Sequence, residues 1–292
     1  MKDEILLVLS VDIFFDQVDA YIKNGYSLRN LELLPKIADV INQTLETYCQ
    51  PKICWLVSDD KRILEKFVEK KDAIVNSTDE VGLHCLISKM FDIDKATEFE
   101  IWNYVENSIK LMNDYGLNPL STRMAGCALN NKLLFALQKN GIKVDSSALP
   151  KRKRDEVIRF DWSSTDSIPY FPSLEDYRIS DIDKSKCYKV LEVPLTTIST
   201  KTSYDRKPLR RYLDLCFKPE IISREIRNVV QQNDIVVTII HPMQLLDQEN
   251  KNELFGNCLE DFRTNLSALI NSCNDFKRKI KCVSMRDLYG LF

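Results

Sequence analysis

Short runs of apolar residues alternate with amphipathic stretches along most of the chain. Ile5–Val11 is apolar except for Ser10, a pattern typical of a strand that is buried on both faces. Leu33–Tyr48 repeats apolar residues at helical spacing, with Pro35 in its first turn. This alternation predicts parallel strands connected by helices.

The same pattern predicts elements along the rest of the chain. Further strands are expected at Ile53–Val57, Val81–Leu83, Pro119–Met124, Ile142–Val144, Val190–Val193, Ile235–Ile240 and Lys281–Met285. Further helices are expected at Arg62–Glu69, Ile101–Met112, Asn130–Asn140, Pro219–Gln231 and Leu259–Cys273. The fold class is therefore α/β, and the length favours a (β/α) barrel of about seven strands, incomplete or distorted. We expect one domain over residues 1–292, with an irregular excursion at about 150–188 where the alternation stops.

Glycine content and charge exclude several classes of protein. Only seven of the 292 residues are glycine, and their spacing permits no dinucleotide-binding turn, phosphate-binding loop or nucleophile elbow. The formal net charge of −2 provides no general basic surface, so nucleic acid is not an expected partner.

The cysteines and the amino-terminal segment bear on the compartment. Nine cysteines are scattered without a C-x-x-C pair, which suits small buried residues of a reducing compartment. The first apolar run is too short for a signal peptide, and no stretch of about 20 apolar residues could span a bilayer. We therefore expect a cytoplasmic protein with no transmembrane segment.

Four ionisable residues follow predicted strands. His84 and His241 are the only histidines, and Asp12 and Asp145 stand at the ends of two further strands. The carboxyl ends of parallel strands meet at one face of a barrel, where α/β active sites are built. Any one of them alone could instead cap a helix or contact water. Their coincidence predicts one shared cavity, which we expect Arg123 to line as well.

Several segments, taken in order, carry a resemblance to a known family. They are Ser10–Asp12, Asp79–Cys85, Arg123–Asn130 with the following helix, Val144–Ser147, Pro169–Ser173, Leu191–Pro194 and Ile240–Pro242. Their order and spacing resemble the motifs of the polysaccharide deacetylases (NodB-like, carbohydrate esterase family 4). The resemblance runs from residue 5 to about residue 245 and marks the chain as a divergent member.

The resemblance implies an activity and a set of roles. Members of the family hydrolyse the acetamide of an N-acetylated sugar with a divalent metal such as zinc. By position, Asp12 would be the catalytic base, Arg123 its tether and His241 the catalytic acid. Asp145 would be the partner of His241, and His84 would be a metal ligand, assisted by Asp12.

The sequence departs from the family where the metal should bind. Ile13 replaces a second acid beside Asp12, and Ser88 replaces the second histidine ligand four residues after His84. A catalytic zinc usually has three protein ligands, so we expect a weakly bound metal or none. Asp16 could assist one turn after Asp12.

Three functions remain open. The first is a deacetylase-like hydrolase, a carbohydrate N-deacetylase acting on a C–N amide bond in surface polysaccharide biosynthesis. Its substrate would be an N-acetylated sugar, nucleotide-linked or lipid-linked. The second is a catalytically silent protein of the same fold that binds a sugar or a biosynthetic partner. The third is a metal-independent or differently liganded hydrolase of another amide.

Other candidates are weaker. The basic run Lys151–Arg154 could bind phosphate, but such runs are usually solvated loops. Four cations within Arg206–Arg211 could bind a diphosphate, although a charged helix start is the simpler expectation. Trp162 could stack on a sugar, as could Trp55, which is more simply a core residue because it lies inside an apolar strand.

Overall fold

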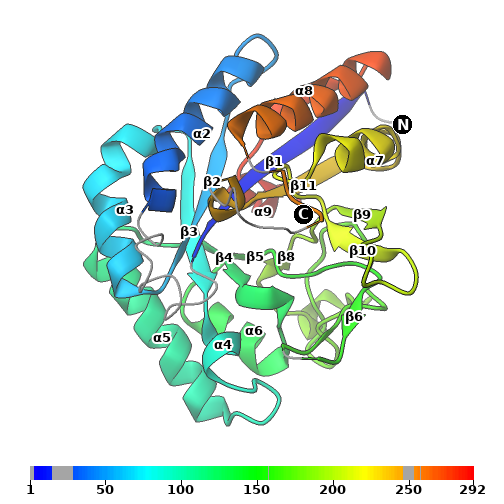
Figure 1. Cartoon of the computed structure of the whole chain (residues 1–292). Coiled ribbons are helices and arrows are strands. Elements are labelled where there is room, and N and C mark those ends of the chain that lie inside the picture. The colour runs from blue at the N-terminus through cyan, green and yellow to red at the C-terminus, as the bar shows by residue number, and fades with distance from the viewer. Residues whose placement is uncertain (1–2, 15–28, 157, 246–252, 257) are drawn as a thin grey trace. The chain divides into compact units, whose positions relative to one another are not determined.

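The computed structural model describes residues 3–14, 29–156, 158–245, 253–256 and 258–292 (Figure 1). The chain divides into two compact units, and each is assembled from three separate stretches. The first unit comprises residues 1–55, 66–79 and 196–284, and the second comprises residues 56–65, 80–195 and 285–292. The excursion at 150–188 lies wholly inside the second unit. The expectation of a single domain stays a prediction.

Parallel strands form the centre of the first unit. The strand order is β11 (Ile235–Ile240), β1 (Glu4–Ile13) and β2 (Ile53–Ser58), and β12 (Lys279–Cys282) pairs with β1 as well. The register of β1 with β11 is parallel and runs from Leu6 opposite Ile235 to Val11 opposite Ile240. Both strands are almost entirely buried, which explains why they read as continuous apolar runs.

Three long helices cover this part of the sheet. They are α2 (Arg29–Leu45), α7 (Pro219–Gln232) and α8 (Leu259–Asp275). Helix α8 packs against α7 and α2, and its buried face includes Phe262, Leu266 and Leu269 (Figure 1). Pro219 occupies the first turn of α7, where its missing N–H group leaves no hydrogen bond unmade.

The second unit continues the α/β pattern. Its strand order is β2, β3 (Glu80–Cys85), β4 (Ser121–Met124), β5 (Val144–Asp145) and β8 (Leu191–Glu192), and the pairings from β3 to β8 are parallel. Its helices are α4 (Ile87–Met90), α5 (Glu98–Asp114), α6 (Asn131–Lys139) and α9 (Met285–Tyr289). Helix α3 (Lys61–Ile74) has residues in both units.

Local sequence fixes the starts of the two long helices of this unit. Thr97 and Glu100 form a reciprocal capping box at α5, and the Asn130 side chain accepts a hydrogen bond from the Leu133 N–H at α6. Helices α5 and α6 pack against each other (Figure 1). These caps and the helix packing hold the segments that follow β3 and β4 in place.

Short pairings replace regular elements within residues 150–188. β6 (Lys153–Arg154) pairs antiparallel with β7 (Phe160–Asp161). Trp162 is fully buried, and its indole N–H donates to the Cys127 carbonyl at 2.8 Å. The ring therefore belongs to the core, as does that of Trp55, and neither can stack on a sugar. Lys151 and Lys153 each form an ion pair with an aspartate, which favours a structural role for the basic run.

Most predicted boundaries shift by a few residues, and two segments differ from the prediction in type. The strand expected at Lys281–Met285 ends at Cys282, and Met285 instead begins α9. The basic stretch before Tyr212 is not a helix start, because Leu209–Tyr212 forms β10 and pairs with β9 (Thr197–Thr200). The Arg211 guanidinium on β10 donates hydrogen bonds to Asp205 Oδ2 and to the Thr200 carbonyl. This cation therefore stabilises the hairpin of β9 and β10.

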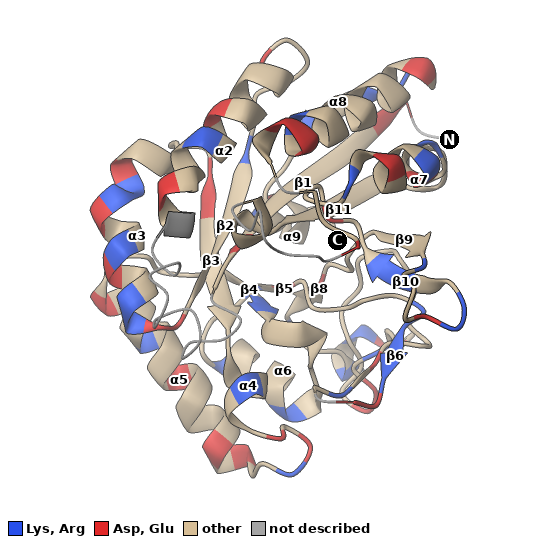
Figure 2. Ribbon diagram, in the orientation of Figure 1, with Lys and Arg blue, Asp and Glu red and all other residues tan. Residues whose placement is uncertain are grey.

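The other predicted strands and helices are present in the predicted order, and the α/β fold class is confirmed. Charged side chains of both signs lie along helices such as α3 and α5, whereas β11 is uncharged (Figure 2). Among the described residues, no helix combines the length and the apolar character needed to cross a membrane.

Candidate functional site

The parallel register of the first unit brings two of the predicted residues to one edge of the sheet. Val11 lies opposite Ile240, so Asp12 and His241 are the next residues on two adjacent strands. Both are buried, with Asp12 3% exposed and His241 8% exposed. The order of residues along these strands therefore positions a carboxylate and an imidazole at the carboxyl ends, as predicted.

His241 has a carboxylate partner that the sequence did not indicate. Its Nδ1 atom is hydrogen-bonded to Asp214, which is fully buried. Asp214 is held in turn by the Cys216 N–H, which donates to its Oδ1 atom at 2.8 Å. A carboxylate on Nδ1 fixes the orientation of an imidazole and stabilises its protonated form. Asp214 is thus the carboxylate on Nδ1 of His241, while the role that the resemblance assigns to Asp145 stays a prediction.

Backbone pairing places Asp214 beside the histidine. The Leu215 N–H donates to the Ile239 carbonyl, and the Ile239 N–H donates to the Leu213 carbonyl. These bonds extend the pairing of β11 by one short segment. Because Ile239 lies two residues before His241, the pairing fixes the separation of the carboxylate and the ring.

Aromatic rings surround the imidazole of His241. The ring centroids of Phe14 and Phe255 lie 5.7 and 6.4 Å from it in edge-on contacts, and that of Tyr212 lies 5.6 Å away. Such apolar surroundings lower the local dielectric and so strengthen the His241–Asp214 hydrogen bond.

The second unit holds the other predicted residues on successive strands. His84 lies opposite Arg123 in the register of β3 with β4, and Thr122 lies opposite Asp145 in that of β4 with β5. All three predicted residues are buried, with Asp145 fully so. His84 is the second-last residue of β3, Arg123 the second-last residue of β4 and Asp145 the last residue of β5.

Arg123 is held by the strand end next to it. Its Nε atom donates to the Ser146 carbonyl at 2.8 Å, and its Nη2 atom donates to Ser146 Oγ at 3.0 Å. Ser146 Oγ donates in turn to the Val193 carbonyl. This chain of bonds fixes the guanidinium of Arg123 in the interior and adds a positive charge close to Asp145.

Asp145 forms a buried acid pair with Glu192. The two residues lie side by side in the register of β5 with β8, and neither is exposed. Ser147 donates to Asp145 through its N–H and its hydroxyl, and the Ala148 N–H donates to Glu192 Oε1. Burial raises the pKa of both carboxyls, and the neighbouring Asp145 raises that of Glu192 further. The pair therefore retains a proton at a pH where exposed acids are ionised.

The residues present do not fit the metal centre that the resemblance implies. Within the described part of the chain, no three His, Cys, Asp or Glu side chains are grouped so as to hold a metal ion. Ile13 supplies no ligand atom, and Ser88 Oγ donates to the Ala125 carbonyl. Asp16 lies outside the described residues.

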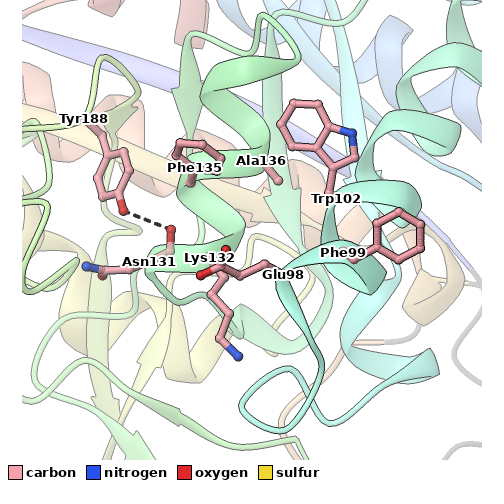
Figure 3. Close-up of a pocket in the computed structure, with 8 residues that line it drawn as sticks. All are labelled: Glu98, Phe99, Trp102, Asn131, Lys132, Phe135, Ala136 and Tyr188. Atoms are coloured by element: carbon pink, nitrogen blue, oxygen red, sulfur yellow. Dashed lines mark hydrogen bonds between the residues drawn. The ribbon is translucent and has the colours of Figure 1, made fainter.

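A separate aromatic pocket lies in the second unit, between the first turns of α5 and α6. It has a volume of about 450 Å³ and is lined by Phe99, Trp102 and Phe135 together with Tyr188, whose hydroxyl donates to the Asn131 carbonyl (Figure 3). Glu98, Lys132 and Ala136 complete the lining. None of the predicted site residues lines it.

Asp214 and Glu192 are two buried acids of these sites that are not predicted from the sequence. The only local signal for Asp214 is that it stands between two leucines, and for Glu192 that it interrupts the apolar run Val190–Val193. A buried acid within an apolar stretch is uncommon unless it is paired. The partner of Asp214 lies 27 residues away and is placed by strand pairing, so sequence spacing does not reveal it.

The described strands and helices have the fold of the polysaccharide deacetylases, a distorted (β/α) barrel. Its curled sheet runs through seven parallel strands from β11 to β8, and β12 pairs with β1 beside them. The sequence itself matches no family model and no curated protein. The likeness appears among solved structures and confirms at the level of the fold the resemblance inferred from the motifs.

Three solved structures are similar over 99% of this chain. A protein from Parabacteroides distasonis described as a glycoside hydrolase/deacetylase has a TM-score of 0.66 and 12% identity over 71% of its own length. A protein from Mycobacterium smegmatis described as a polysaccharide deacetylase has a TM-score of 0.59 and 12% identity over 90% of its length. A GH57-type branching enzyme from Pyrococcus horikoshii has a TM-score of 0.52 and 10% identity over 70% of its length.

Proposed function

We propose that the protein is a hydrolase that removes the acetyl group from an N-acetylated sugar during surface polysaccharide biosynthesis. The buried His241–Asp214 pair at the end of β11 is the observation that carries the proposal. The fold, shared with proteins described as deacetylases, supports it. The sugar would be nucleotide-linked or lipid-linked and would be processed in the cytoplasm.

The chemistry needs a base and an acid. Water attacks the amide carbonyl and loses a proton to the base, the C–N bond breaks, and the nitrogen leaves with a proton from the acid. In the proposed reaction Asp12 accepts the proton from water. His241 donates the proton to the leaving nitrogen from Nε2, because Asp214 occupies Nδ1. Acetate and the amino sugar are the products.

Metal dependence is a separate part of the proposal. A divalent ion such as zinc would be bound weakly or not at all, because Ile13 and Ser88 replace two expected ligands. Metal analysis of the purified protein tests this statement. Stoichiometric zinc, nickel or cobalt that survives dialysis would contradict it.

Release of acetate from N-acetylated oligosaccharides and nucleotide sugars tests the activity, measured with and without added metal. If His241 is the acid, His241→Ala should lower kcat at least about 100-fold. Asp214→Asn should lower kcat about 10-fold to 100-fold, because the carboxylate that orients the His241 imidazole is lost. Asp275→Asn, which removes an exposed carboxylate elsewhere in the first unit, should leave kcat unchanged. Equal activity of His241→Ala and the parent would overturn the proposal.

A catalytically silent protein that binds a sugar or a biosynthetic partner is the second candidate. The poor fit to a metal centre favours it, because loss of ligands removes the usual activity of the fold while the fold persists. The two candidates differ in one measurement. Saturable binding of an N-acetylated sugar, with no acetate released under any metal condition, would favour the silent protein.

A further inference from the structure

Two cysteines from distant parts of the sequence contact each other in the first unit. Cys49 follows the turn after α2, and Cys282 is the last residue of β12. Their Sγ atoms lie 3.1 Å apart although 233 positions separate them in sequence. All nine cysteines fall within the described residues, and no disulfide joins any two of them.

The two thiols differ in access and in ionisation. Cys49 is partly exposed, whereas Cys282 is buried at 4% exposure. A hydrogen bond from the Cys282 thiol lowers the pKa of Cys49 to about 7, and the same contact raises that of Cys282. At neutral pH Cys49 is therefore partly a thiolate that reagents can reach, with a protonated thiol held against it. A thiolate of this kind is the species that attacks disulfides.

We propose that Cys49 and Cys282 form a redox-responsive pair, which a low-molecular-weight disulfide converts into a cross-link between the end of α2 and β12. The Cys49 thiolate attacks one sulfur of the reagent, so a mixed disulfide forms and one small thiolate leaves. Cys282 then loses its proton to solvent and attacks the Cys49 sulfur, which expels the second small thiolate. Two protein thiols are oxidised and one small disulfide is reduced to two thiols.

The geometry needs little change for this reaction. A disulfide has an S–S distance of about 2.05 Å, so the two sulfur atoms must approach by about 1 Å. β12 pairs with β1, and Cys282 lies opposite Leu7, so one partner is fixed by the sheet. The cross-link would join segments far apart in the chain, and such a long closed loop restricts the unfolded state strongly. Oxidation should therefore stabilise the first unit.

The experiment treats the reduced, full-length protein with oxidised glutathione and then blocks the remaining thiols with N-ethylmaleimide. Peptide mapping by mass spectrometry should recover a Cys49–Cys282 disulfide as the main product. The oxidised protein should unfold at a Tm higher by several degrees, and dithiothreitol should reverse the shift. Cys282→Ser should stop at the mixed disulfide with glutathione on Cys49.

Cys258 provides the matched control, because it is an exposed cysteine in the same unit. Cys258→Ser should leave the cross-link and the Tm shift unchanged. If Cys282→Ser does not fold, Cys282→Ala is used instead, and the rate of alkylation of Cys49 is measured as a function of pH.

In the parent this rate should rise with an apparent pKa of about 7, and in Cys282→Ala it should rise at a higher pH.

A disulfide between other cysteines, or a cross-linking yield unaffected by Cys49→Ser, would overturn the proposal. An identical alkylation profile in the parent and in Cys282→Ala would also contradict it. None of these readouts depends on deacetylation, so the inference stands or fails independently of the proposed function.

Discussion

At the scale of single residues, the buried acids of the chain have two different environments. Asp214 contacts an imidazole, so a proton can be shared between unlike groups. Asp145 instead contacts another acid, Glu192, and the two carboxyls cannot both ionise at low cost without water. In the proposed reaction the first arrangement would transfer a proton to the substrate, whereas the second retains a proton inside the protein.

The acid pair makes the stability of the protein depend on pH. Burial raises both carboxyl pKa values above their ordinary values of 3.8 and 4.5, so the folded state binds more protons than the unfolded state above those values. Stability should then be greatest below about pH 4.5 for these two groups and fall as the pH rises towards the folded-state values. Glu192→Gln keeps the shape of the side chain and removes one titratable group. The free energy of unfolding of this variant should therefore depend less on pH than that of the parent.

Urea unfolding at several pH values between 5 and 8 measures the effect. The free energy of unfolding of Glu192→Gln should exceed that of the parent by an amount that grows as the pH rises through this range, because only the parent must lose the proton that the folded state holds. Glu106→Gln on the exposed face of α5 provides the control and should follow the parent. Parallel curves for the parent and Glu192→Gln would show that the pair does not hold a proton.

At the scale of elements, the close approach of β3 and β4 depends on one glycine. A Cβ atom at Gly82 would lie 2.4 Å from Ser121 Oγ, 2.7 Å from Leu56 Cδ2 and 2.8 Å from the Ser121 carbonyl oxygen. The last contact is with backbone, so a side-chain rotation cannot relieve it. Gly82 therefore sets the spacing of the two strands whose ends carry His84 and Arg123.

Gly82→Ala should destabilise the protein by about 1–3 kcal/mol, because added atoms in a packed interior force the strands apart. Chemical denaturation measures the change. Adding Ser121→Ala should recover only part of the loss, since it removes the Oγ contact and leaves the carbonyl contact. Gly290→Ala is the control, because the nearest atom to its Cβ is 3.8 Å away. Equal stability of Gly82→Ala and the parent would refute this role.

Periodicity predicted most elements, and the failures have physical causes. β1 and β11 are buried on both faces, so their continuous apolar runs indicate strands. α7 has one apolar face, so its helical spacing of apolar residues indicates a helix. β10 was mistaken for a helix start because its stability comes from pairing with β9, which a local pattern does not contain. Asp12 and His241 could be placed from strand ends, whereas Asp214 could not, because pairing with β11 positions it.

At the scale of the whole molecule, the chain passes between the two compact units several times. Residues 56–65 belong to the second unit although both neighbouring stretches belong to the first, and the last stretch of the first unit ends at residue 284. Neither unit is therefore a single continuous fragment. Both ends of the 150–188 excursion lie in the second unit.

Limited trypsin digestion tests this connectivity. The exposed segment Lys184–Lys186 should be cleaved early. The nicked protein should nevertheless elute as one species in size-exclusion chromatography and separate only in denaturant, because contacts within the second unit hold both sides of the cut. Two stable fragments that separate under native conditions would contradict the assignment of residues 80–195 to one unit.

The pairing of β1 with β11 also bears on how the protein is made. Ile13 ends β1 and Ile235 begins β11, so 221 residues must be synthesised between them. At about 5–20 residues per second, a ribosome takes roughly 10–45 s to supply the neighbour of β1. During that time the nascent chain presents an apolar strand with unpaired backbone groups on that edge, which other chains can bind. Productive synthesis should therefore depend on chaperones that cover the first strand until the late strands emerge.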